Sequence, residues 1–261
     1  MNYKYIGKPY LRPDAINKVT GKAIYLDDVR LQGMLYAAVL RPQYAHALIK
    51  KVDTSAAEKC PGVVKVVTGK DCKFRYGDNI KDLQPMAVTK IRYIGDPVAA
   101  VIADSPAHAR AALDKIAVEY EPLPVYTDAL DAMAKDAVLI HEDMDDYWRL
   151  PTLKQKSGTN IANTYHLKKG RGEEGFDEAD VIIEGEFNYP LGSCAAIEPH
   201  GTIVWFKEDN TIEVWSTSIC PFIIREDLAH SYGMPIGDVR VHVTDLGGCF
   251  GYKSDITTEQ T

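Results

Sequence analysis

IRYIGDPVAAVIADSPAHARAALDKIAVEYEPLP, residues 91–124, carries the strongest fold signal in the chain. Gly95-Asp96-Pro97 separates two apolar stretches, and residues 104–106 provide a helix entry because proline is tolerated at the first helical position. The apolar side chains that follow are spaced for one helical face, at positions 109, 112, 113 and 116. Residues 116–124 then alternate apolar and polar, as in a half-buried strand that ends at proline. The stretch therefore predicts strands interleaved with a helix.

The flanking segments continue this alternation. The apolar run 34–41 and the β-branched run 63–69 are typical of strands, with another extended piece before Asp53, so residues 14–124 form a mixed α/β unit. Residues 125–175 are irregular and predict a connecting segment that runs over the surface. Beyond it, we expect a strand over 181–190, a hairpin over 202–217, a helix from Pro221 to Gly233, and a strand over 238–246.

Composition excludes several classes of protein. With 46% hydrophobic residues and a net charge of -7, the chain has no basic surface for nucleic acid. Its apolar runs are too short to span a membrane, and the N-terminus has no apolar leader, so we expect a cytoplasmic protein. Its five cysteines are odd in number and widely spaced, which argues against a disulfide framework and against a zinc or iron–sulfur clamp.

LGGCFGYK, residues 246–253, is a glycine-rich loop directly after a predicted strand. Glycines permit positive φ and let backbone N–H groups approach a phosphate or an oxo anion. A tight turn that needs glycine only for its backbone explains the same pattern, and the loop matches neither GxxxxGK[ST] nor GxGxxG. Cys249 is either an exposed thiol or a small residue packed within the loop.

IEPHG, residues 197–201, places Glu198 and His200 two positions apart, so that they face the same side of an extended segment. Such a pair suits metal ligation or acid–base chemistry. Chance placement at a turn is the alternative. The remaining histidines lack ligand spacing, and we assign no metal site and no catalytic residue within the chain.

These motifs together resemble a known family. DAINKVTGKAIYLDDV (14–29), LRPQYAHALIKKVDTSAAEKCPGV (40–63) and IRYIGDPVAAVIAD (91–104) are similar to the α/β hammerhead domain of the molybdenum-binding subunit of xanthine dehydrogenases and aldehyde oxidases. IEPHG, VWSTSICPF and GGCFGYKSD resemble the start of its molybdopterin-binding region, in the same order. The implied fold is α+β, with a hammerhead domain (1–124), a connecting segment (125–175) and the first part of a molybdopterin-binding domain (176–261).

The resemblance also implies a function. Members hydroxylate an electron-poor carbon of an aromatic heterocycle or an aldehyde at a molybdenum-pterin centre, and electrons leave through iron–sulfur clusters and FAD. The chain has no cysteine pattern for clusters and no dinucleotide fingerprint, so an iron–sulfur subunit and a flavin subunit are expected as partners. Matching positions imply cofactor contacts at Gly247, Gly248, Phe250 and Gly251, and a place for Glu198 in the small-molecule substrate pocket.

Three departures from the family pattern leave an alternative open. The loop usually reads GGGFGGK, whereas Cys249 and Tyr252 replace glycines here, and Ile219 stands where a glutamine side chain normally reaches the molybdenum ligands. Family subunits also continue much further, through most pterin contacts and the general-base glutamate. Either another chain or domain completes the site and this chain is inactive alone, or it is a fragment or a non-catalytic scaffold of such a complex.

Overall fold

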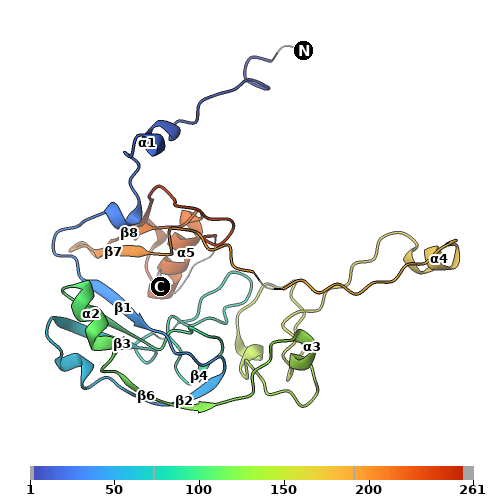
Figure 1. Ribbon diagram of the computed structural model, residues 1–261, viewed down its shortest axis with the longest axis horizontal. Coiled ribbons are helices and arrows are strands. Elements are labelled where there is room, and N and C mark those ends of the chain that lie inside the picture. The colour runs from blue at the N-terminus through green and yellow to red at the C-terminus, as the bar shows by residue number, and fades with distance from the viewer. Residues whose placement is uncertain (1–2, 73, 191, 255–261) are drawn as a thin grey trace. The chain divides into compact units, whose positions relative to one another are not determined.

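The computed structural model describes residues 3–72, 74–190 and 192–254 (Figure 1). It has the expected α+β character. The helices are α1 (Ala15–Val19), α2 (Pro106–Leu113), α3 (Ala129–Ala132), α4 (Gly172–Asp177) and α5 (Pro221–Tyr232). The strands are β1 (Tyr36–Leu40), β2 (Ala47–Asp53), β3 (Val63–Thr68), β4 (Lys90–Ile91), β5 (Ala99–Ala103), β6 (Ala117–Pro122), β7 (Thr202–Phe206), β8 (Ile212–Ser216) and β9 (Val239–Val243).

Residue contacts divide the chain into two compact units. One, the insert unit, comprises residues 35–193, and the other, the terminal unit, combines residues 1–34 with 194–261. The expected boundaries at 124 and 175 stay a prediction. Among the described residues, no helix has both the length and the apolar character needed to cross a bilayer.

The first sheet of the insert unit has the antiparallel order β1-β5-β3. β5 lies at its centre because its AAVIA sequence is apolar on both faces, and all of its residues except Ile102 are buried. α2 covers this sheet with Ala109 and Ala112, as expected from the sequence, but the helix ends at Leu113, so Ile116 packs against the same core from the following turn. Its N-terminus is capped by Ser105, whose Oγ accepts the His108 N–H at 3.3 Å.

The second sheet has the order β4-β2-β6, and both of its pairings are antiparallel. Its core consists of Ala47, Ala87, Ile91 and Val98, with Val118 and Tyr120 of β6 packed against them. The alternation expected over residues 116–124 is therefore realised, because the apolar side chains of β6 face this core.

A buried carboxylate orders the turn between β4 and β5. Asp96 is buried, and its Oδ2 accepts the backbone N–H of Arg92 at 3.0 Å. Burial raises the pKa of Asp96 from 3.8 to about 6, because removal from water disfavours the ionised form. The Gly95-Asp96-Pro97 punctuation in the sequence thus marks a turn that is held by its own side chain.

The connecting segment is attached to the sheets through polar groups. The buried Lys90 donates to the backbone oxygen of Leu139 at 2.6 Å and forms an ion pair with Glu142. Arg92 donates to the backbone oxygen of Ile140 at 3.0 Å. Segment 139–142 is therefore fixed by two cations, one in β4 and one directly after it, although the segment forms no strand.

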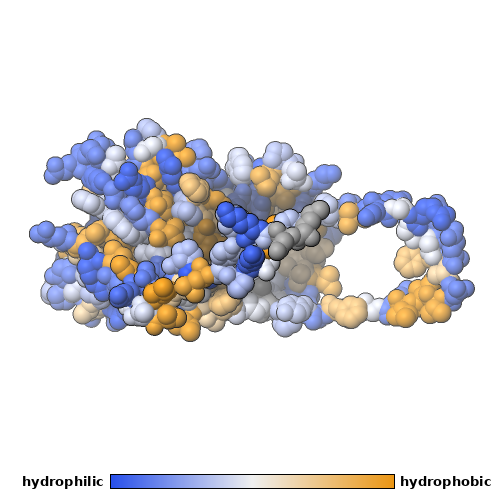
Figure 2. All heavy atoms as spheres, turned by 90° about the horizontal axis from the view of Figure 1, so that it is seen from above, coloured by the Kyte–Doolittle hydropathy of each residue, from blue (hydrophilic) through white to orange (hydrophobic). Residues whose placement is uncertain are grey.

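Residues 164–190, which we call the arm, extend away from the rest of the insert unit and carry α4 (Figure 1). The sequence predicts a strand over 181–190, and this prediction is wrong for the structure, where that segment is extended without a ladder partner. Its odd-numbered side chains are strongly exposed, with Phe187 at 94% and Tyr189 at 96%. Figure 2 shows apolar surface along the arm. The alternating pattern is present, but the described residues offer it no neighbouring strand.

The terminal unit contains the sheet β7-β8-β9 with α5 packed on it. β7 and β8 form the expected hairpin, with Asn210 at a φ of +63° in the turn. α5 begins at Pro221 and ends at Gly233, whose φ of +63° closes the helix as expected. Ile212, Val214, Ile224, Leu228 and Val239 form the core between the sheet and this helix.

Replacement of Asp96 by asparagine should change how stability depends on pH. The folded pKa of about 6 exceeds the ordinary 3.8, so the contribution of wild-type Asp96 favours the folded state at low pH and is lost as the pH rises through 6. An asparagine at this position cannot ionise but still accepts from Arg92. The unfolding free energy of Asp96→Asn relative to wild type should rise between pH 4 and 6, by at most about 1.4 kcal/mol per pH unit.

Urea titrations of both proteins across that range would measure this difference. Burial lowers the pKa of His141 to about 4, which opposes the trend in the wild type, but this contribution is common to both proteins and cancels. A difference that stays constant with pH would contradict the assignment.

Candidate functional site

The topology of the terminal unit brings three loops to one edge of its sheet. β8 and β9 are parallel, so their carboxyl ends lie at the same edge, and β7 is antiparallel to β8, so its amino end lies there too. The loops at this edge are residues 194–201 before β7, 217–220 between β8 and α5, and 244–254 after β9. In α/β sheets with a βαβ connection, ligands bind at the carboxyl ends of parallel strands.

Backbone hydrogen bonds join the three loops. The Thr217 N–H donates to the Gly201 carbonyl at 3.3 Å, and the Ile219 N–H donates to the Lys253 carbonyl at 3.0 Å. The Glu198 N–H donates to the Gly247 carbonyl at 3.2 Å. The expected cofactor residues and Glu198, 49 or more positions apart in sequence, are therefore brought into one cluster.

The glycine loop is built from left-handed backbone. Gly248, Phe250 and Gly251 have φ values of +103°, +54° and +87°. Gly247 is needed for another reason, because a Cβ at that position would lie 2.5 Å from the Cβ of Glu198. The positive φ expected from the sequence is present at Gly248 and Gly251 but not at Gly247, whose close approach is to Glu198, and the expected approach to a ligand stays a prediction.

Most amides of this loop are not engaged by the described residues of the protein. The Tyr252 N–H donates to the Cys249 carbonyl at 2.8 Å, and the Gly247 N–H donates to Glu198. Within the described part of the chain, the N–H groups of the four residues from Gly248 to Gly251 have no protein acceptor. Successive N–H groups in such a turn form a concavity that binds anions.

A buried ion pair underlies the loop. Lys253 is fully buried, and its Nζ lies 2.7 Å from Oε2 of Glu198, which also accepts the Gly247 N–H at 2.8 Å. The other oxygen, Oε1, is shielded from solvent and has no hydrogen-bond partner among the described residues. Lys253 is not among the residues predicted from the sequence. A single lysine at the end of a glycine loop, together with a glutamate in a separate motif, could have suggested an ion pair.

His200 does not join Glu198 in a ligand pair. Its ring packs edge-on against Tyr252, with the ring centroids 4.3 Å apart, whereas the Glu198 carboxylate is directed at Gly247 and Lys253. No set of three potential metal-ligating side chains occurs within residues 3–72, 74–190 and 192–254. Glu198 instead anchors the glycine loop through Gly247 and Lys253, a role that the sequence did not predict.

The loop between β8 and α5 is tied to the glycine loop by a buried hydroxyl group. Ser218 is buried, its Oγ donates to the Lys253 carbonyl at 3.2 Å, and it accepts the Cys220 N–H at 3.0 Å. Ile219 is 48% exposed and offers no hydrogen-bonding side chain. Ser218 was also missed in the sequence, where nothing distinguishes it from other loop serines.

A segment near the N-terminus supports the same edge. The Asp245 N–H donates to the Ile24 carbonyl at 2.9 Å, and the Ile24 N–H donates to Oδ2 of Asp245 at 3.2 Å. Leu26 covers Gly201 so closely that a Cβ there would lie 2.6 Å from the leucine side chain. The beginning of the 244–254 loop is therefore held by a residue more than two hundred positions earlier.

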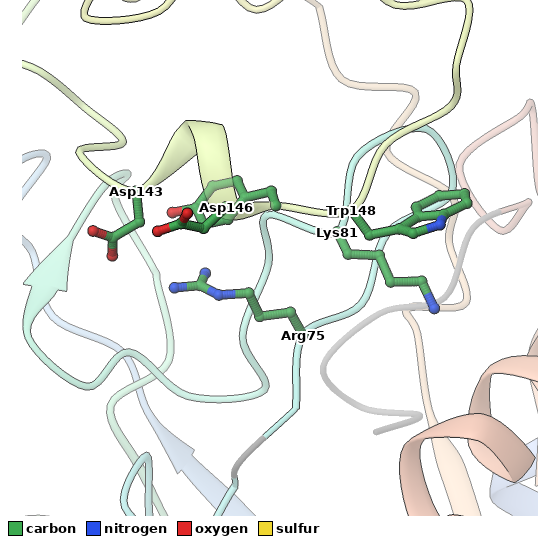
Figure 3. A pocket seen from close by; sticks show the side chains of 6 residues that line it. Arg75, Lys81, Asp143, Asp146 and Trp148 are labelled. Atoms are coloured by element: carbon green, nitrogen blue, oxygen red, sulfur yellow. The ribbon is translucent and has the colours of Figure 1, made fainter.

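The insert unit has a cavity of its own, with a volume of about 330 Å³ (Figure 3). It is lined by Arg75, Lys81, Asp143, Asp146, Tyr147 and Trp148. The Arg75 guanidinium lies 4.4 Å from the Tyr147 ring centre and donates to the Asp82 carbonyl, while Lys81 lies over the Trp148 ring. Because these cations already have partners and none of the expected site residues lines the cavity, the glycine loop remains the candidate site.

Replacement of Gly247 by alanine should destabilise the terminal unit. The new methyl group would overlap Glu198, so the loop or the 194–201 segment must shift, at a cost of about 1–3 kcal/mol. Gly237→Ala is a matched control, because a Cβ there meets nothing within 4 Å. Chemical denaturation should show a lower free energy of unfolding for Gly247→Ala and little change for Gly237→Ala. Equal stability of the two variants would contradict the close approach.

Comparisons with known proteins agree with this architecture. The family model for the aldehyde oxidase and xanthine dehydrogenase a/b hammerhead domain matches residues 20–124, and that for the molybdopterin cofactor-binding domain matches residues 153–261. A probable xanthine dehydrogenase subunit of Bacillus subtilis is 33% identical over 257 residues, which cover 97% of this chain and 32% of that protein.

Solved structures show the same fold. Carbon monoxide dehydrogenase from Oligotropha carboxidovorans superposes with a TM-score of 0.85 at 28% identity, over 97% of this chain and 32% of that chain. The aldehyde oxidoreductase from Desulfovibrio gigas gives a TM-score of 0.80 at 31% identity, over 97% of this chain and 28% of that chain. The chain spans about a third of the length of the curated relatives that it matches.

The resemblance seen in the sequence is thus confirmed by two family models in the expected order and by the fold. The chain belongs to the family of aldehyde oxidases and xanthine dehydrogenases, with a hammerhead domain followed by a molybdopterin cofactor-binding domain.

Proposed function

We propose that this chain supplies the hammerhead domain and one cofactor-binding loop of a molybdenum hydroxylase that acts on an aromatic heterocycle or an aldehyde. The observation that supports this most strongly is the run of amides from Gly248 to Gly251 that have no acceptor among the described residues, in a loop whose two ends are joined by Glu198. The matched molybdopterin cofactor-binding domain includes this loop. When bound, the cofactor supplies the two-electron oxidation of the substrate carbon.

The described residues fit such a cofactor. Molybdopterin presents negatively charged oxygen and sulfur atoms, and backbone N–H groups at Gly248, Phe250 and Gly251 would donate to them. Gly247 keeps the loop close to Glu198, whose buried Oε1 can accept a hydrogen bond from a bound group. In this proposal the loop binds and orients the cofactor, and Glu198 borders the substrate pocket.

We propose further that other polypeptide completes the enzyme and that this chain is inactive alone. The exposed apolar face of the arm, formed by Val181, Ile183, Phe187 and Tyr189, supports this proposal, because such a face is unfavourable in water. An iron–sulfur subunit and a flavin subunit would carry the electrons away from the site.

We also propose a cytoplasmic location. All five cysteines are free. Free thiols together with the absence of disulfides are typical of proteins in reducing compartments.

A second candidate function is a scaffold that has kept the fold without the cofactor. Ile219 favours it, because this exposed side chain replaces one that would hydrogen bond in the cofactor's surroundings. Cys249 and Tyr252 add bulk where the family loop has glycine. The two candidates differ in one measurable property, the presence of pterin.

Metal and pterin analysis of the protein from its native host should find molybdenum and pterin in a stoichiometric complex with larger partners. Gly251→Val should lose both, because a branched side chain at a φ of +87° distorts the loop. Gly158→Val is the control, since Gly158 has a φ of +68° and equally open surroundings outside the loop. Elemental mass spectrometry and the fluorescence of oxidised pterin provide the readouts.

A wild-type complex that is free of metal and pterin would refute the hydroxylase and support the scaffold. In that case Gly251→Val should leave partner binding unchanged. Measured hydroxylase activity of the isolated chain would instead contradict the dependence on partners.

The arm should become protected when the complex assembles. If a strand of the completing polypeptide pairs with residues 181–189, their backbone amides acquire acceptors. Hydrogen exchange in the native complex should then be slow over 181–189 and fast in the polar residues 168–171, which serve as an internal control. Fast exchange in both segments would remove the arm as a docking element.

A further inference from the structure

We propose that Lys253 and Glu198 form a positioning pair that sets the shape of the glycine loop and thereby aims the amides of Gly248–Gly251 at the anionic cofactor. The proposal deepens the proposed function and rests on it. Neither residue needs to touch the reacting atoms, because each acts through the backbone of the loop.

One carboxylate oxygen joins both ends of the loop. Oε2 of Glu198 accepts the N–H of Gly247, at the start of the loop, and the Nζ of Lys253, at its end. A second link runs in the opposite direction, from the Glu198 N–H to the Gly247 carbonyl. The separation of the two ends is therefore fixed by a single side chain, and only residues 248–252 lie between them.

The main chain of Lys253 is fixed independently of its ammonium group. Its carbonyl accepts from the Ile219 N–H at 3.0 Å and from Ser218 Oγ at 3.2 Å. The residue is consequently attached to the 217–220 loop through its backbone and to the 194–201 loop through its side chain. Because Gly247 and Lys253 are both held, the residues between them connect the two ends with positive φ at Gly248, Phe250 and Gly251.

Because the pair is buried, each charge depends on the other for stabilisation. An uncompensated charge inside a protein is unfavourable, so loss of either partner leaves the other without its counter-ion. Without Lys253, the carboxylate of Glu198 would be left without its counter-ion next to Gly247, in a loop whose amides are expected to bind an anion. Without the charge of Glu198, a fully buried ammonium would remain. In the paired state the charges of Glu198 and Lys253 compensate each other, so the N–H groups of the loop determine its attraction for an anion.

The chain offers a matched control pair. Lys90 in the insert unit is also almost fully buried and forms an ion pair with Glu142, and it donates to the Leu139 carbonyl. Lys90→Met therefore removes the same kind of interaction far from the glycine loop in sequence. Any effect that Lys253→Met has beyond that of Lys90→Met is attributable to the position of Lys253.

The experiment compares wild type, Lys253→Met and Lys90→Met, each isolated from the native host with the polypeptides that copurify. Two quantities are measured: pterin content per chain, and hydrogen exchange of the Gly247 amide, which donates to Glu198. Lys253→Met should lower pterin content about tenfold or more and accelerate exchange at Gly247, whereas the Ile219 amide, which donates to the main chain of residue 253, serves as an internal reference. Lys90→Met should leave both quantities near wild type.

Each other outcome overturns the proposal. Unchanged pterin content and exchange in Lys253→Met would show that the loop does not depend on the pair. Faster exchange with unchanged pterin content would make the pair merely structural. Wild-type protein without pterin would overturn the proposed function itself, an outcome that is distinguishable because it does not require a variant.

Glu198→Gln keeps the test decisive if Lys253→Met fails to fold. Glutamine has the same shape and still accepts from Gly247 and Lys253, but it lacks the charge that strengthens both hydrogen bonds. Its pterin content should lie between those of wild type and Lys253→Met, with a native circular dichroism spectrum. A pterin content equal to that of wild type would overturn the requirement for a charged pair.

Discussion

The parallel pairing of β8 with β9 is the constraint on which the site depends. Ile212 opposite Val239 and Ser216 opposite Val243 fix the register, and α5 covers the buried face of both strands. A parallel pair joined through a helix places both following loops at one edge. The antiparallel hairpin then adds the segment before β7 to that edge. A slip of one residue in β8 would expose Ile212 and Val214 and separate the three loops.

Local signals made much of this fold predictable. α5 begins at Pro221 and ends at Gly233, the hairpin turns at Asn210, and β5 follows an apolar run, so short-range rules suffice for each. The arm differs, because alternation in 181–190 describes which side chains could be buried, whereas a strand exists only when a neighbour supplies hydrogen bonds.

The candidate site could be predicted only in part for the same reason. The glycines are visible in the sequence, but the Glu198–Lys253 contact spans 55 positions and no spacing rule connects the two residues. Ser218 contributes through contacts that only the folded chain creates. The departures that the resemblance implies at Ile219, Cys249 and Tyr252 concern side chains around the loop, not its backbone amides.

The terminal unit is assembled from both ends of the described chain, with residues 35–193 inserted between its two parts. During synthesis the insert unit therefore has all of its strands long before Ile24 can meet Asp245. The segment around Ile24 must wait, unpartnered, for most of the translation time of the chain, and contacts of such long sequence separation form slowly. The connectivity thus sets an order of synthesis, in which the glycine loop can take shape only after all strands of the insert unit have been made.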